Sequence, residues 1–381
     1  MTSPWRNDFA IPVDGPTYLN TAAEGLPRQR AIEASQRYAE AKMRGSLGRP
    51  EFDRIEEAAA AAGARLTGFD HADMALTPSV SDAISTLAFS YPWEPGDEVV
   101  LTDLEFPANV LPWLAVRDRF GVNVRVVPTA GGLIDPDRVA EASGPRTRVI
   151  SVSAVSYKSG GIADVAELAR VAGGVDALLC VDATQALGIV PLDLTGADVA
   201  WCSGYKWLGG LHGAALSAVR ERARNRLGPG PFGWRSVPNI FTADRFATVH
   251  PHDDGRRFRL GSPPYPALYA LHAALEEVVD LDAEAASAHV RTLGDALVDG
   301  LADLGVELLT PAEPARRAGI VAFEHLDFAA IGEALADANV VVWAKDRRVR
   351  ISFHLYNTPA DIETCLHELS ATLPAHAGAK G

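Results

Sequence analysis

The stretch VDATQALGIVPLDLTGADVAWCSGYKWLGG, residues 181–210, decides the fold, because it joins the ends of two short apolar segments. The segments 177–182 and 198–202 are short and continuously apolar, which is typical of buried parallel strands. Asp182 ends the first, and Ser203-Gly204-Tyr205-Lys206 follows the second. Ligand sites of parallel α/β sheets form beyond the carboxyl ends of the strands, so this stretch predicts a site holding a carboxylate, a hydroxyl and an amine.

The same alternation continues upstream. Apolar segments predict strands at 98–102, 122–127 and 148–154, and helical spacing predicts helices at 51–66, 80–89, 109–119 and 165–172. Short strands alternating with amphipathic helices indicate an α/β fold with a mostly parallel central sheet covered by helices on both faces.

The C-terminal third has a different pattern. Residues 228–266 are rich in glycine, proline and charge and predict loops. Helices are expected at 267–279, at 283–304 and from residue 359, with strands at 320–324 and 349–354. We therefore expect an N-terminal arm over 1–20, a large domain over 21–250 and a smaller α+β domain over 251–381.

Composition limits the possible functions. The 381 residues carry 35 basic and 49 acidic groups, a formal net charge of −14, which argues against a nucleic-acid or anionic membrane partner. The hydrophobic fraction of 48% is enough for a folded core. Only five of the basic residues are lysines, so chemistry that needs an amine has few candidates.

Three cysteines without a CxxC spacing imply neither a disulfide framework nor a zinc site, and no metal site is expected. The N-terminus lacks the pattern of a secretory signal, and no apolar run is long enough to span a membrane. A cytoplasmic location is the expectation.

Several motifs resemble the class V aminotransferase family of fold-type I enzymes that use pyridoxal 5′-phosphate (PLP). They occur in family order: YLNTAAEGLP (18–27), TPSVSDAIS (77–85), GDEVVLTDLEFPAN (96–109), VSYKSGGIADV (155–165), VDATQALG (181–188), SGYKWLGGLHGAAL (203–216), FRLGSPPYPAL (258–268) and VRISFHLYNTPADIE (349–363). The family includes cysteine desulfurases, isopenicillin N epimerase, kynureninase and hercynylcysteine sulfoxide lyase. The resemblance implies the fold-type I architecture, PLP as cofactor, and an amino acid as substrate.

The resemblance assigns roles to the residues at the strand ends. Lys206 would form the Schiff base with PLP, which requires an amine of lowered pKa. Asp182 would pair with the pyridine nitrogen and keep it protonated. Gln185 would donate a hydrogen bond to the 3′ oxygen of the cofactor.

The cofactor phosphate needs donors and a helix N-terminus. Ser79, Val80 and Ser81 open the helix expected at 80–89, and Ser203 is a further donor. By resemblance, Ser262 would reach the phosphate of a facing subunit, which implies a homodimer with shared active sites.

The remaining family positions concern the substrate side. Phe106 stands where desulfurases carry a histidine over the cofactor ring, and phenylalanine stacks but moves no proton. Tyr205 replaces a second histidine and would donate to the phosphate. Arg350 aligns with the arginine that binds the substrate α-carboxylate, and Tyr157 and Asn20 are expected on the substrate side.

Desulfurases carry a nucleophilic cysteine shortly before this arginine, whereas residues 340–350 read VVVWAKDRRVR. A carbon–sulfur lyase that acts by β-elimination on a cysteine S-conjugate or sulfoxide, with Lys206 as proton shuttle, is therefore the leading hypothesis. A PLP-dependent epimerase, or a decarboxylating oxidative deaminase of a cysteine-derived secondary metabolite, is the alternative. A desulfurase ranks below both.

Two other classes have weaker support in the sequence. A regulatory protein that keeps the fold without catalysis would be expected to carry an appended basic or helix-turn-helix domain, and the sequence suggests none. A nicotinamide dehydrogenase would place G-x-G-x-x-G after its first strand, and this chain does not.

Overall fold

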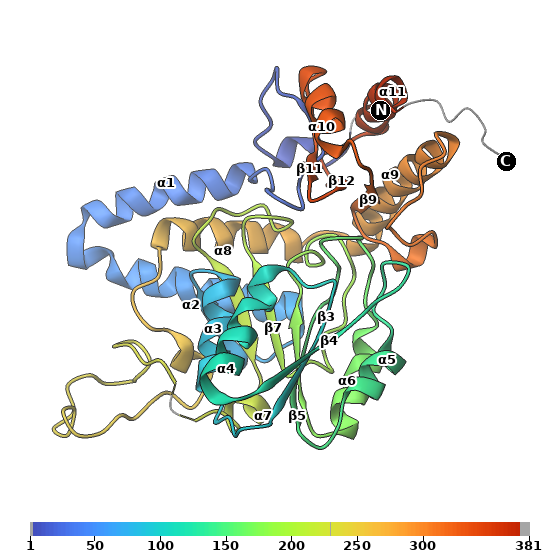
Figure 1. Cartoon of the computed structure of the whole chain (residues 1–381). Helices are drawn as coiled ribbons and strands as arrows, with labels where there is room; N and C mark the ends of the chain where they lie inside the picture. Colours follow the sequence, from blue (N-terminus) through green and yellow to red (C-terminus); the bar gives the residue numbers. More distant parts are fainter. Residues whose placement is uncertain (1–2, 229, 374–381) are drawn as a thin grey trace.

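A twisted seven-stranded sheet forms the centre of the larger part of the molecule (Figure 1). The computed structural model describes residues 3–228 and 230–373. Across the sheet the strands follow the order β2 (Met74–Thr77), β8 (Ala215–Val219), β7 (Val199–Ser203), β6 (Leu178–Asp182), β5 (Thr147–Ser153), β3 (Glu98–Thr102) and β4 (Asn123–Val127). Only β8 is antiparallel to its neighbours, so the other strands end at the same edge.

Apart from the largely exposed edge strand β4, both faces of this sheet are buried, and alternate residues of each strand point to opposite faces. Val99 and Leu101 of β3 pack in one apolar cluster with α3 (Val80–Ser90) and α4 (Leu111–Phe120). Val100 packs in the other cluster, with the helices α2 (Arg49–Thr67), α5 (Pro136–Ala142), α6 (Val165–Gly174) and α8 (Tyr265–Val279). Burial on both faces explains why these strands read as continuous apolar runs.

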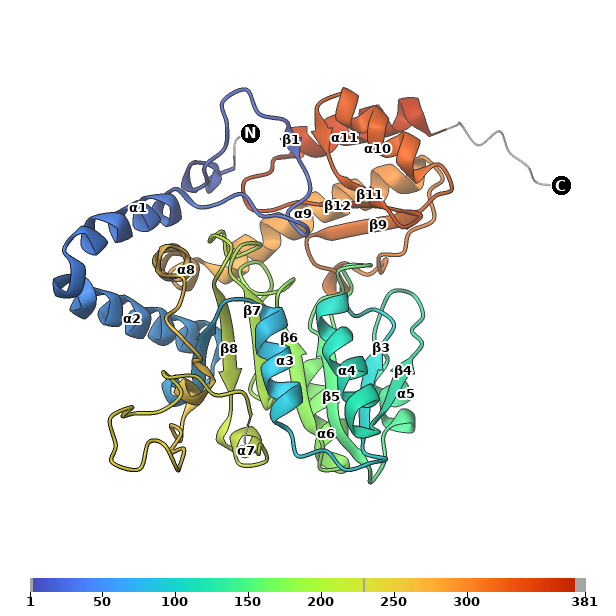
Figure 2. The same ribbon diagram turned by 60° about the vertical axis from the view of Figure 1, so that its left-hand side comes forward.

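The C-terminal part is a smaller α+β unit (Figure 2). Its antiparallel sheet has the order β11 (Trp343–Lys345), β12 (Arg348–Ser352) and β9 (Ile320–Glu324), with α9 (Ala283–Asp303), α10 (Phe328–Asp337) and α11 (Pro359–Thr372) packed around it. The β11–β12 turn is tight because Asp346 and Arg347 both have positive φ, at 55° and 56°.

The N-terminal residues join the two parts. Strand β1 (Thr17–Tyr18) pairs in parallel with β10 (Val340–Val341). Helix α1 (Gln29–Met43) then packs with α2 along α8, as both views show. The remaining elements are α7 (Glu221–Arg224) and the short 3₁₀ helices Arg6–Asp8, Gly45–Gly48, His71–Asp73, Pro107–Asn109, Gly255–Phe258 and Pro314–Arg316.

The predicted α/β architecture is confirmed, and most expected elements start or end within two residues of the observed ones. The elements that were not predicted are the helices α1, α5, α7 and α10 and the strands β1, β2, β8, β10 and β11. The long segment 228–264 forms no α-helix or β-strand at the residues described, as its composition suggested. The domain limits at residues 20 and 250 stay predictions.

No helix among the described residues is long and apolar enough to cross a membrane. The same residues contain no group of three or more His, Cys, Asp and Glu side chains placed to hold a metal ion.

The loop that contains Gly25 fixes the backbone around Lys206. Gly25 N donates to Tyr205 O at 3.1 Å, and Arg28 N donates to Gly209 O at 2.8 Å. A Cβ atom on Gly25 would lie 2.0 Å from Lys206 O, which is backbone and cannot rotate away.

We predict that Gly25→Ala destabilises the protein by about 1–3 kcal/mol, since the clash must be relieved by moving the Lys206 loop. Urea or thermal unfolding measures the change. Gly173→Ala is the matched control: a Cβ there meets no atom within 4 Å, and alanine favours the helix. Equal stability of Gly25→Ala and wild type would contradict the prediction.

Candidate active site

One pocket collects side chains from the carboxyl ends of five strands. Its lining consists of Ser79, Val80, Ser81, Phe106, Ala108, Ser153, Val155, Tyr157, Asp182, Thr184, Gln185, Ser203, Tyr205 and Lys206. Strands β2, β3, β5, β6 and β7 are mutually parallel, so the segments that follow them meet at this edge. Ten residues singled out in the sequence are thereby brought together.

Lys206 is a buried amine, 7% exposed. Its Nζ makes no hydrogen bond or ion pair with any described residue. Burial lowers its pKa from 10.5 to about 8; the charge of Asp182 opposes this fall, and that of Arg350 adds to it. The lowered pKa makes the neutral amine, which is the nucleophile and proton acceptor, far more accessible near neutral pH than in an exposed lysine.

Asp182 ends β6 and is also buried. Its Oδ1 accepts a hydrogen bond from Thr184 N at 2.9 Å, and Thr184 Oγ1 accepts one from Ser203 N at 3.1 Å, which ties β6 to β7. Burial raises the pKa of Asp182, while the hydrogen bonds from Thr184 and the charge of Lys206 lower it. The pocket therefore holds a carboxylate that a cationic ligand group would stabilise.

Gln185 is buried, and neighbours hold both ends of its amide. Nε2 donates to Ala22 O at 3.0 Å, and Oε1 accepts from Trp207 Nε1 at 2.6 Å. These bonds orient the amide and leave its second N–H for a ligand in the pocket. The sequence suggested this donor but not the partners that orient it.

The N-terminus of α3 opens onto the same pocket. Ser79 caps the helix: its Oγ accepts a hydrogen bond from Asp82 N at 3.1 Å and donates one to Asp82 Oδ2 at 2.7 Å. That hydroxyl is therefore occupied, and the backbone N–H groups of the first turn and the Ser81 hydroxyl are the donors toward an anion. Ser203 is a further hydroxyl on the lining.

Tyr205 lies between the pocket and a surface histidine. Its ring stacks on His212 at a centroid distance of 3.9 Å, and His212 Nε2 lies 3.4 Å from Glu24 Oε2. Burial raises the pKa of the Tyr205 phenol, and the charges of Glu24 and Asp182 add to this, so it is a proton donor to ligands. No pattern in the sequence indicated that His212 or Glu24 lies beside it.

Phe106 and Tyr157 form an aromatic wall beside the amine. Their centroids are 5.1 Å apart in a T-shaped contact, and Lys206 Nζ lies 5.4 Å from the Phe106 ring centre. The adjacent Glu105, which the sequence reasoning missed, anchors this segment. Its buried carboxylate accepts from Asn109 Nδ2 at 2.8 Å and from Ser153 Oγ at 2.6 Å. In the sequence, the only indication that Glu105 matters was that it is an acidic residue within the turn LEFPAN.

Three predicted site residues are not on the lining. Arg350 is adjacent to it, since Nη1 donates to Tyr157 O at 3.1 Å. Asn20 pairs with Ser352 in a β-bridge, and its buried Oδ1 has no hydrogen-bond partner among the described residues. Ser262 lines separate hollows beside α2, with Arg235 and Pro263, so within one subunit it does not reach the pocket.

All three cysteines are buried and away from the pocket lining. Cys180 lies in β6, Cys202 in β7 and Cys365 in α11. Burial raises the pKa of each thiol, that of Cys365 to about 12. None is a reachable thiolate nucleophile.

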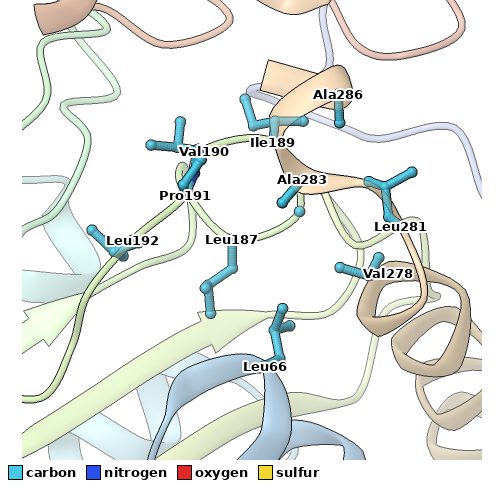
Figure 3. A pocket seen from close by; sticks show the side chains of 11 residues that line it. Leu66, Leu187, Ile189, Val190, Pro191, Leu192, Val278, Leu281, Ala283 and Ala286 are labelled. Carbon is cyan, nitrogen blue, oxygen red and sulfur yellow. The ribbon is translucent and has the colours of Figure 1, made fainter. Parts of the chain in front are cut away.

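A second cavity, of about 140 Å³, lies where α2, the segment 187–192 and the α8–α9 junction meet (Figure 3). Leu66, Leu187, Val278, Leu281 and other apolar side chains line it. Its lining contains no titratable group, so the chemistry belongs to the Lys206 pocket.

Comparison with known proteins agrees with this geometry. A family model described as Aminotransferase class-V matches residues 17–365. The uncharacterized aminotransferase YcbU of Bacillus subtilis is 28% identical, over 91% of this chain and 90% of that protein. A probable cysteine desulfurase of Pseudomonas putida is also 28% identical, over 95% and 96%.

Solved structures show the same fold. The cysteine desulfurase CsdA of Escherichia coli superposes with a TM-score of 0.86 at 24% identity, covering 97% of each chain. The cystine C-S lyase C-DES, in complex with its product cysteine persulfide, superposes with a TM-score of 0.87 at 24% identity, covering 95% of this chain and 99% of the other.

We predict that Lys206 titrates near pH 8 in protein freed of bound ligand, since burial disfavours its charged form. With only five lysines in the chain, ¹³Cε-lysine NMR resolves each titration. The Lys206 signal is identified as the one that is missing in Lys206→Arg, and its titration midpoint should be near pH 8. Asp182→Asn should lower this midpoint further, and Arg350→Gln should raise it. A midpoint close to 10.5 would contradict the assigned environment.

Proposed function

The chain belongs to the class V aminotransferase family and uses pyridoxal 5′-phosphate, and on this basis we propose that it eliminates a sulfur substituent from the β-carbon of an S-substituted cysteine or cysteine sulfoxide. The observation that carries the proposal is the combination of a buried amine of lowered pKa with the absence of any reachable thiol.

The pocket residues fit this cofactor. Lys206 Nζ, which has no partner among the described residues, would attach to it covalently, and the buried Asp182 carboxylate would pair with its ring nitrogen. The first turn of α3, with Ser81, Ser203 and Tyr205, would bind the phosphate. Phe106 would stack on the ring, and Gln185 would donate its free N–H to the 3′ oxygen. When bound, the cofactor supplies an electron sink for the bond broken at the substrate α-carbon.

The protein groups then have separate tasks. Arg350 would bind the α-carboxylate, next to Tyr157. Lys206 Nζ would accept the α-proton, because the Phe106 ring has no basic atom that could accept it. Loss of the β-sulfur group with its electron pair, followed by hydrolysis with one water, gives pyruvate, ammonia and the sulfur product.

This assignment distinguishes the chain from its desulfurase relatives. A desulfurase transfers sulfur to a protein cysteine, which must ionise and move. Here β11 and β12 are joined by the tight Asp346-Arg347 turn, and Cys180, Cys202 and Cys365 are buried with raised pKa values. Elimination needs no protein thiol.

We predict equimolar pyruvate and ammonia from at least one member of a panel of S-alkylcysteines and cysteine sulfoxides. Lys206→Ala should lose the visible absorption of the bound cofactor, and its rate should fall by about 10²–10⁴-fold or more. Solvent deuterium entering the α-position without pyruvate would instead favour epimerisation, and release of carbon dioxide would favour oxidative decarboxylation. A panel that yields no pyruvate would overturn the elimination proposal.

Iodoacetamide is the control for the desulfurase alternative. The native protein should keep its activity after treatment, and its thiols should be alkylated only after unfolding, because all three are buried. Loss of activity together with alkylation of one native cysteine would favour a desulfurase.

We also propose a homodimer in which Ser262 completes the partner's phosphate site. Supporting it, Ser262 lies outside its own subunit's pocket, and the segment 230–264 exposes Trp234, Phe241 and Phe246. Large exposed apolar side chains in one segment are typical of an interface.

The dimer predicts a mass by light scattering of twice 40.5 kDa. Lys206→Ala and Ser262→Glu should each be inactive alone, and a refolded mixture should recover activity, because a hybrid dimer keeps one intact site. A monomeric mass, or hybrid dimers without recovered activity, would contradict shared sites.

A further inference from the structure

Strand β12 places two arginines on one face. Arg348 and Arg350 are two residues apart, so their side chains leave the strand on the same side. They are 4% and 3% exposed. Two cations therefore lie close together away from water, and burial together with the charge of Arg348 lowers the pKa of Arg350 to about 10.

Among the residues that the structure describes, no carboxylate compensates this pair. Arg28, Arg224 and Arg317, the other buried arginines of the described chain, form ion pairs with Glu277, Asp73 and Asp295 respectively.

Arg348 and Arg350 form no ion pair with a described residue. Glu324, opposite Arg348 in the β9–β12 ladder, is exposed and forms none with it. The buried Arg348 Nε and Nη2 and Arg350 Nε also have no hydrogen-bond partner among the described residues. Burying two unpaired cations raises the free energy of the folded protein unless a bound anion compensates their charge.

Aromatic rings hold the two guanidinium groups in place. The Trp343 ring centre is 4.9 Å from Arg348 Cζ and 5.1 Å from Arg350 Cζ. Arg348 Cζ is also 5.4 Å from the Tyr157 ring centre. Stacking preorganises the guanidinium planes but leaves their edge donors and their charge unsatisfied.

The arginine pair adjoins the pocket through one residue. Tyr157 lines the pocket, contacts Arg348 with its ring and accepts a hydrogen bond from Arg350 with its carbonyl. On its other side Tyr157 meets Phe106, next to Lys206. An amino acid whose α-carbon is near Lys206 would therefore bring its anionic groups to these two arginines.

We propose, building on the function proposed above, that Arg348 is a specificity-determining residue that binds a second anionic group on the substrate side chain. The substrate class is an S-substituted cysteine whose substituent carries a carboxylate or sulfonate. Arg350 binds the α-carboxylate of the substrate, and Arg348 binds the anionic group of its side chain.

Binding of non-reacting probes to the holoenzyme tests this without turnover. By calorimetry, glutarate should bind about tenfold to a hundredfold more tightly than pentanoate, as expected for one extra charge-assisted hydrogen-bonded contact. Arg348→Gln should abolish the preference and leave pentanoate binding unchanged, and Arg348→Lys should restore part of it. Arg347→Gln, an exposed arginine in the adjoining turn, is the charge-matched control and should behave as wild type.

A substrate pair of equal length gives the second measurement. In wild type, kcat/KM should be about tenfold to a hundredfold higher for S-(2-carboxyethyl)cysteine than for S-propylcysteine. Arg348→Gln should remove this difference by raising KM for S-(2-carboxyethyl)cysteine. The proposal is overturned if wild type does not prefer the dianionic ligand, or if Arg348→Gln weakens both ligands equally, which is the result of a purely structural role.

The two proposals fail differently. A glutarate preference that depends on Arg348, without pyruvate from any substrate, would refute elimination and keep the anion site. Pyruvate formed equally well from both S-conjugates would keep elimination and refute the anion site.

Discussion

The parallel pairing of β6 with β7 is the constraint on which the site depends. Ala183 N donates to Trp201 O at 2.7 Å, and Ser203 N donates to Thr184 Oγ1, so the two strands end together. Asp182 and Lys206 are thereby held beside each other in a buried edge, where each shifts the pKa of the other. Every other pocket residue is positioned relative to these two by strands of the same sheet.

Sequence reasoning predicted the central strands well because each is buried on both faces and is therefore a short, continuously apolar run. It missed α1, whose buried positions Ala31, Ala34 and Ala41 give little apolar contrast. It also missed β8, Ala215–Val219, which follows a glycine-rich loop and reverses direction against its neighbours. Strand direction depends on pairing, which local periodicity does not encode.

For the site, motif order indicated which residues belong together, and ten of them line one pocket. It did not indicate the contacts that orient them. The Gln185 amide is held by Ala22 and Trp207, and Glu105 is held by Asn109 and Ser153. These partners are distant in sequence or ordinary in type, so only the fold identifies them. Arg348 was equally indistinguishable among many arginines until its lack of an acidic partner was visible.

The hairpin β11–β12 connects reaction type with substrate charge. Its two-residue turn is too short to carry a mobile nucleophile, and the same geometry sets Trp343 opposite Arg350 in the ladder. Trp343 then stacks on both guanidinium groups, so the hairpin that carries no cysteine also holds the two cations side by side. In a chain with a net charge of −14, the proposed dianionic substrate would depend on such a local pair, because the overall field repels anions. The proposed elimination and the proposed selectivity thus have a common structural origin in one short turn.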